Sequence, residues 1–151
     1  MLPPGPLTAV AMTRQTSHLS QFIYCSVLSP DAAPTCVADI IRTARRVNAE
    51  LDVTGVLVFD GERFCQYIEG PAAPIEELAQ RIGRDPRHTG FSPLHHGPLE
   101  GPRRFAQWSM AYALAPDLEP LNRMRVLRGL PAVELLQQLL PDLDLGPLQP
   151  A

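Results

Sequence analysis

The sequence predicts an α+β fold in which strands and helices follow the order βαββαββ. Short β-prone runs alternate with two longer segments in which apolar residues recur at helical spacing. Turn signals rich in Gly, Pro and Asp separate these segments. The 151 residues, 45% of them hydrophobic and 19% charged, suit one globular domain with its own core.

The first half of the chain predicts a strand, a helix and then a hairpin. Residues 19–27 are apolar and β-prone, and a Ser-Pro-Asp turn signal follows them. A helix is expected over 35–48, where apolar residues form one stripe and arginines occupy the outer face. Two strands, 53–59 and 63–69, lie on either side of an Asp-Gly hairpin turn.

The second half predicts one more helix and two more strands. The helix is expected over 74–84, where a proline opens it and acidic residues occupy its first turn. Strands are expected around 91–99 and 104–114. The first six elements match the split βαβ pattern, in which the first and third strands are neighbours in the sheet centre. The prediction is therefore a ferredoxin-like fold with a mixed five-stranded sheet and two helices on one face.

The two ends of the chain are expected to lie outside this domain of residues 19–114. Residues 1–18 contain three prolines and lack a charged start, so we expect a flexible extension rather than a signal peptide. Residues 115–151 predict two short amphipathic helices. Because the second face of the sheet is also apolar and needs a cover, these helices are expected on that face, or else in contact with a second copy.

Three polar side chains are predicted to converge beneath the two main helices. Strand alternation directs Tyr24 and Gln66 to the same face of neighbouring strands. Asn48 lies on the apolar stripe of the first helix. A buried polar group costs about 1–3 kcal/mol unless it is hydrogen-bonded. Either these groups satisfy one another and Asn48 caps its helix, or they surround a polar ligand; together they favour a ligand ring with alternating donors and acceptors.

Five motifs occur in order and with compatible spacing over residues 19–114. They are FIYCS at 22–26, Asn48 followed by DVTGVL at 52–57, FCQYIEG at 64–70, RDPRH at 84–88 and RFAQWSM at 104–110. Together they resemble the successive motifs of the BLUF family, the sensors of blue light using FAD. Val47 is a departure, because many members carry a polar residue beside the asparagine.

The resemblance implies FAD bound without a covalent bond between the two helices, with FMN or riboflavin as possible substitutes. The residues implied to contact it are Tyr24, Ile41, Asn48, Gln66, Arg87 and His88. Asn48 would hydrogen-bond the carbonyl and imide edge of the ring. Arg87 and His88 would lie near the ribose and phosphates, although a solvated basic helix end explains them nearly as well.

The resemblance also implies that Tyr24, Gln66, Trp108 and Met110 are photochemical residues. Trp108 and Met110 are expected to share a strand face and to match the pair that exchanges places near Gln66, although both also suit an ordinary core. Cys65 follows the opposite strand parity, so we assign it no photochemical role.

The implied function is a light sensor without enzymatic turnover, which signals to an unidentified partner protein or through self-association. One alternative is a module of the same fold that binds a ligand or forms oligomers without photochemistry. A small ferredoxin-like hydrolase of acyl phosphates is disfavoured, because the loop after the first strand offers no arginine-rich anion cradle.

Composition argues against several other classes. The net charge of −3 disfavours nucleic-acid binding. His95 and His96 are adjacent and would diverge on a strand, so a metal site is not expected. The three cysteines have no C-x-x-C spacing and suit reduced, buried residues of a cytoplasmic protein. No apolar stretch is long enough to span a membrane.

Overall fold

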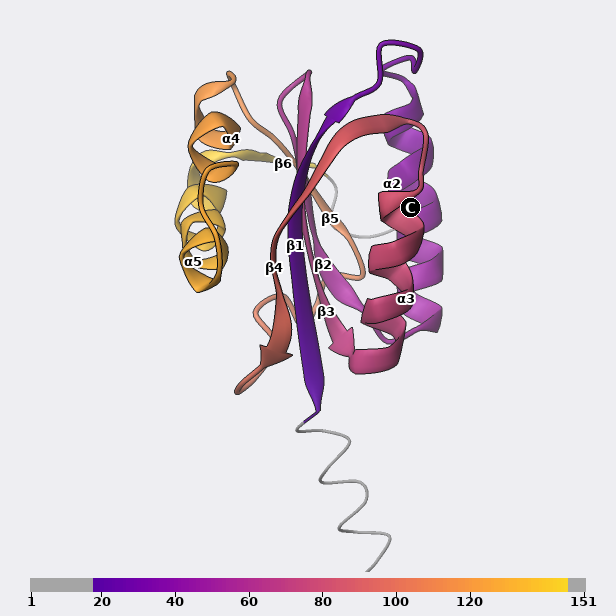
Figure 1. Ribbon diagram of the computed structural model, residues 1–151, viewed down its shortest axis with the longest axis vertical. Coiled ribbons are helices and arrows are strands. Elements are labelled where there is room, and N and C mark those ends of the chain that lie inside the picture. Colours follow the sequence, from indigo (N-terminus) through magenta and orange to yellow (C-terminus); the bar gives the residue numbers. More distant parts are fainter. Residues whose placement is uncertain (1–17, 147–151) are drawn as a thin grey trace, which may run out of the picture.

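A computed structural model describes residues 18–146, which form three layers (Figure 1). Helices α2 (Cys36–Glu50) and α3 (Ala72–Gly83) cover one face of a central sheet. Helices α4 (Glu119–Met124) and α5 (Leu130–Leu139) cover the other face. The predicted N-terminal extension lies outside the described residues, apart from its last residue.

The central sheet has six strands in the order β4-β1-β3-β2-β5-β6. The strands are β1 (Leu19–Leu28), β2 (Thr54–Phe59), β3 (Arg63–Pro71), β4 (His88–Leu99), β5 (Ala111–Leu114) and β6 (Asp144–Leu145). All neighbouring pairs are antiparallel except β2 and β5, which are parallel. This confirms the α+β, ferredoxin-like class and the central β1–β3 pair, while the two-residue β6 adds one strand to the expected five.

The hairpin between β2 and β3 forms where the Asp-Gly pair predicts it. Oδ1 of Asp60 accepts hydrogen bonds from the backbone N–H groups of Glu62 and Arg63, at 2.9 and 2.6 Å. Gly61 has a φ of 99°, a conformation that glycine adopts without steric cost. The turn thus sets the β2–β3 register in which Leu57 lies opposite Gln66.

The prediction of a strand over 104–114 is wrong for the first half of that segment. β5 begins only at Ala111, and turns occupy the residues before it. The backbone N–H groups of Arg104 and Phe105 donate to the buried carboxylate of Glu69, at 2.8 and 2.7 Å, instead of to a neighbouring strand. The carbonyl of Trp108 accepts from the N–H of Gly55 at 2.9 Å. Strand alternation therefore does not apply to this segment.

The C-terminal helices supply the second cover of the sheet within the chain itself. α4 packs against β3, and α5 packs against β4. Met124, Val133 and Leu136 are fully buried in a core that they share with Ile23 and Tyr67 of the sheet. A short 3₁₀ turn, Leu140–Asp142, continues from α5 toward β6. Of the two alternatives for this segment, the intramolecular cover is the one observed.

Candidate functional site

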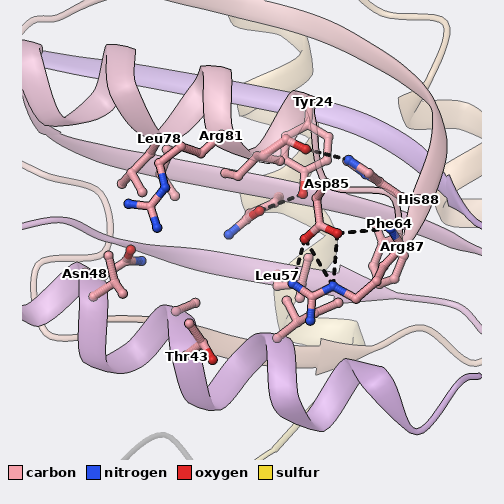
Figure 2. Close-up of a pocket in the computed structure, with 16 residues that line it drawn as sticks. Tyr24, Thr43, Asn48, Leu57, Phe64, Leu78, Arg81, Asp85, Arg87 and His88 are labelled. Carbon is pink, nitrogen blue, oxygen red and sulfur yellow. Dashed lines mark hydrogen bonds and ion pairs between the residues drawn. The ribbon is translucent and has the colours of Figure 1, made fainter. Parts of the chain in front are cut away.

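A cavity of about 190 Å³ lies between α2 and α3, above strands β1, β2 and β3 (Figure 2). Its apolar lining consists of Ile40, Ala44, Val47, Leu57, Phe64, Ile68, Leu78 and Ile82. Its polar lining consists of Tyr24, Thr43, Asn48, Gln66, Arg81, Asp85, Arg87 and His88. The predicted trio of Tyr24, Gln66 and Asn48 therefore borders one cavity.

Tyr24 and Gln66 line the cavity from two neighbouring strands, and their side chains are in direct contact. They are directly opposite each other in the β1–β3 register. The Tyr24 hydroxyl donates to Oε1 of Gln66 at 2.6 Å, and both side chains are buried. Burial is the main reason that the pKa of Tyr24 lies well above its ordinary value, so the phenol keeps its proton over the whole neutral range.

The amide nitrogen of Gln66 has a much weaker partner than its oxygen. Nε2 of Gln66 lies 3.7 Å from the sulfur of Met110, which is fully buried. A thioether is a weak acceptor. The Gln66 amide is thus held firmly at its oxygen and loosely at its nitrogen, and it borders open space. A stronger acceptor in the cavity could replace the sulfur at little cost.

Asn48 belongs to the site and does not cap its helix. Its Nδ2 donates to the backbone carbonyl of Ser109 at 2.8 Å. The helix end is instead closed by backbone bonds from Leu51 and Val53 to the Asn48 carbonyl, at 3.2 and 2.8 Å. The buried Asn48 side chain therefore ties α2 to the segment that leads into β5, while it also lines the cavity.

The opposite end of the cavity carries charged groups (Figure 2). Arg87 binds Asp85 in a forked ion pair, with Nε–Oδ1 at 3.0 Å and Nη2–Oδ2 at 2.6 Å. The Arg87 hydrogen bond is the main cause that lowers the pKa of Asp85. The His88 ring bridges Oγ of Ser26 at 2.7 Å and the Ile82 carbonyl at 2.6 Å. Arg87 and His88 border the cavity as predicted, and both also hold the fold together.

Arg81 also lines the cavity, although it is not among the residues predicted from the sequence. It lies three residues after Leu78, which is on the buried side of α3. This spacing was visible in the sequence, because residues three apart on a helix share a face. Val47 lines the cavity as well, so an apolar side chain occupies the position that is polar in many BLUF proteins.

Two predicted site residues lie elsewhere. Ile41 does not line the cavity; it faces a second groove, and Ile40 lines the cavity instead. Consecutive helix residues point about 100° apart, so a one-residue error changes the neighbours. Trp108 and Met110 do not share a face: Trp108 stacks on Phe105 in the core beneath the C-terminal helices, whereas Met110 contacts Gln66. Cys65 faces that C-terminal side, as its strand parity predicts.

The cavity fits the ring of a flavin. Its apolar walls suit an aromatic ring system, and the amides of Asn48 and Gln66 can each donate to and accept from alternating polar atoms at a ring edge. Arg81 and Arg87 offer cationic partners for phosphates that extend from the ring. Among residues 18–146, no group of three or more His, Cys, Asp or Glu could hold a metal ion.

The family model described as sensors of blue light using FAD matches residues 19–111. The chain belongs to the BLUF family. BLUF domains are sensor modules, and some relatives carry one beside a cyclase. The match begins at the first residue of β1 and ends at the first residue of β5, so it contains the whole cavity.

Similar proteins include much longer chains. The photoactivated adenylate cyclase subunit beta of Euglena gracilis is 33% identical over 109 residues, which is 72% of this chain and 12% of that protein. The subunit of Euglena longa is 33% identical over 97 residues, 64% of this chain and 11% of that protein. This chain therefore spans only about a tenth of the length of these relatives.

Solved BLUF structures share the fold. The dark-state structure of the BLUF protein BlrB is 31% identical, with a TM-score of 0.69 over 82% of this chain and 95% of that one. Klebsiella pneumoniae BlrP1 is 28% identical, with a TM-score of 0.62 over 82% of this chain and 33% of that one. No helix within residues 18–146 is long and apolar enough to cross a bilayer.

Proposed function

We propose that this BLUF protein senses blue light through FAD bound without a covalent bond between α2 and α3, and that it transmits the signal to a partner. Bound flavin would supply the blue-light absorption and an electron acceptor. The observation that carries the proposal is the 2.6 Å hydrogen bond from Tyr24 to Gln66 beside a cavity that a flavin ring fits.

The chain's own residues account for a light-driven switch without turnover. Tyr24 can give up an electron while its phenolic proton moves to Oε1 of Gln66 along the existing hydrogen bond. When the electron and a proton return to Tyr24, the Gln66 amide would be left rotated, or tautomeric if it keeps the phenolic proton on Oε1 and gives up one from Nε2, because its nitrogen was held only by the Met110 sulfur. In the new arrangement the Gln66 amide would offer a stronger hydrogen-bond donor to a carbonyl at the edge of the bound ring. The network is thus bistable, and light selects between its two satisfied states.

The proposal also covers the signal output, the identity of the flavin and the role of Trp108. The relatives named as photoactivated adenylate cyclases link light to an enzyme. For this chain we propose an output through a separate partner protein in the cytoplasm, or through homo-oligomers. We also propose FMN or riboflavin as substitutes for FAD in the same cavity. Trp108 remains a proposed photochemical residue, which would act from the far side of the sheet.

An absorption experiment tests the proposal. The purified protein should be yellow, and blue light should shift its flavin bands to longer wavelength, with full recovery in the dark. Tyr24→Phe and Gln66→Leu should abolish the shift and retain bound flavin. A Gln66→Leu protein that cycles normally contradicts the mechanism. A colourless protein that cannot be reconstituted with FAD contradicts the function, and it favours a ligand-binding or adaptor module without photochemistry.

A further inference from the structure

A second groove runs along the other side of α2, between this helix and the segment that enters β5. It encloses about 810 Å³, and its borders include Ser109 and Tyr112. Its floor contains Val37 and Ile41, which are 5% and 8% exposed. None of these four side chains lines the cavity between α2 and α3, so the groove is a separate surface feature.

The groove is rich in arginine. Arg42, Arg45 and Arg46 line it, and among the described lining residues none is Asp or Glu. The whole chain has a net charge of −3, so this cationic surface is local. Asp39 pairs with Arg42, but both side chains are mostly exposed, and such a pair is easily replaced by another carboxylate. The groove thus combines an apolar floor with a positive rim.

The groove shares backbone contacts with the Gln66 switch. Nε of Arg45 donates to the carbonyl of Met110 at 2.9 Å. The sulfur of the same Met110 contacts the Gln66 amide at 3.7 Å. One residue earlier, the Ser109 carbonyl accepts from Asn48 of the cavity. A rearrangement of Gln66 that releases or displaces Met110 therefore acts directly on an arginine of the groove.

We propose that this groove docks an acidic amphipathic helix of a signalling partner, and that light changes its affinity through Met110 and Arg45. The light dependence rests on the proposed function. α2 has 15 residues and is about 22 Å long, which suits a helix laid into the groove with its apolar face on the exposed Pro34, Ala38 and Ala49 that line it. Carboxylates on its flanks would pair with Arg42 and Arg46.

An anionic membrane is the less suitable partner for the same charges. Membrane-bound amphipathic helices insert apolar side chains into the bilayer. Val37 and Ile41 are buried in the floor of a concave surface and cannot insert. A protruding helix from a partner can instead pack on the exposed Pro34, Ala38 and Ala49 that line the same groove.

The test uses the full chain with bound flavin and a synthetic helical peptide that carries Leu on one face and Glu on the other. The peptide bears a red-absorbing dye, so that the measuring light does not drive the photocycle. Fluorescence anisotropy should report binding, and a peptide with Gln in place of Glu should bind at least tenfold more weakly. The double variant Arg42→Glu, Arg46→Glu should lower affinity for the Glu peptide at least tenfold. The control Arg123→Glu on the exposed side of α4 should change it less than twofold.

Affinities measured in the dark and under blue light distinguish a failure of this inference from a failure of the proposed function. Wild-type affinity should differ at least threefold between dark and blue light, and Gln66→Leu should abolish the difference while it keeps dark binding. A protein that completes the photocycle but binds both peptides equally, or binds with equal affinity in dark and light, overturns the inference alone. Arginine-dependent binding to phosphatidylserine vesicles without peptide binding overturns it in favour of a membrane. A changed oligomer mass in the double variant, without a change in peptide binding, overturns it in favour of a second copy.

Discussion

The two faces of the β1–β3 strand pair each carry a tyrosine beside a glutamine, with the two residue types on exchanged strands. On the α2–α3 side, Tyr24 of β1 donates to Gln66 of β3 at 2.6 Å. On the side of the C-terminal helices, the Tyr67 hydroxyl of β3 lies 2.9 Å from Oε1 of Gln21 of β1. All four side chains are buried, so burial alone does not distinguish a switch from a structural contact.

The surroundings of the two pairs differ. Nε2 of Gln21 donates to the Pro98 carbonyl at 3.1 Å, and the Tyr67 hydroxyl also lies 3.2 Å from Glu69. Glu69, which is fully buried, accepts further bonds from the side chain of Thr54 and from two backbone N–H groups. The pair on this side is therefore locked by strong partners. The Gln66 pair has a weak sulfur partner and adjoins a cavity, and these two features allow a second arrangement.

The largest difference between the two faces should appear in the photocycle when each glutamine is replaced in turn. Gln66→Leu should abolish the light-induced shift of the flavin bands, whereas Gln21→Leu should leave it in place, because only Gln66 borders the cavity. Absorption spectra before and after blue light measure both, with bound flavin quantified after denaturation. Loss of the shift in a folded, flavin-loaded Gln21→Leu protein would show that the two faces are not functionally distinct.

Glu69→Gln should reduce the free energy of unfolding by about 2 kcal/mol, because the amide cannot accept all the hydrogen bonds that the buried carboxylate accepts. The matched control Glu134→Gln concerns an exposed residue of α5 and should change stability by less than about 0.5 kcal/mol. Urea unfolding followed by circular dichroism measures both. Equal stability of the two variants would contradict the locked network.

Tyr67→Phe should cost about 1 kcal/mol of stability and keep the photocycle, since it removes one hydroxyl from a network that retains its other bonds. Tyr24→Phe should show the reverse pattern, with the photocycle lost. Urea midpoints together with dark-recovery traces provide the comparison. A photocycle lost in both variants would contradict the assignment of the switch to one face.

The smallest effect concerns alkaline pH. Burial raises the pKa of both Tyr24 and Tyr67 above the ordinary value of 10.0. In the unfolded chain these phenols ionise near pH 10, while the folded state keeps them protonated. Stability should therefore be nearly constant below pH 9 and fall as the pH rises through the unfolded pKa, by less than about 1 kcal/mol between pH 9 and 10. Urea midpoints at these pH values measure the slope, which each Tyr→Phe variant should reduce; an unchanged slope in both variants would contradict the prediction.

Much of the proposed switch was predictable from local patterns. The alternation of side chains along a strand directs Tyr24 and Gln66 to one face, and the split βαβ order makes their strands neighbours. Helical periodicity directs Asn48 inward in the same way. Ile41, which the resemblance implies as a cofactor contact, faces the second groove, whereas Ile40 lines the cavity; both belong to the apolar stripe, and the stripe does not say which half faces the cavity.

The sequence by itself thus determined the order of elements, the central strand pair and the faces of residues within regular elements. The position of the residues before β5 depends on contacts that form in the complete fold. Trp108 and Met110 lie on opposite sides of the sheet because the buried Glu69 carboxylate captures the backbone of Arg104 and Phe105 and prevents a regular strand there. Strand and helix periods are local, whereas hydrogen bonds between residues about 35 positions apart depend on the completed fold.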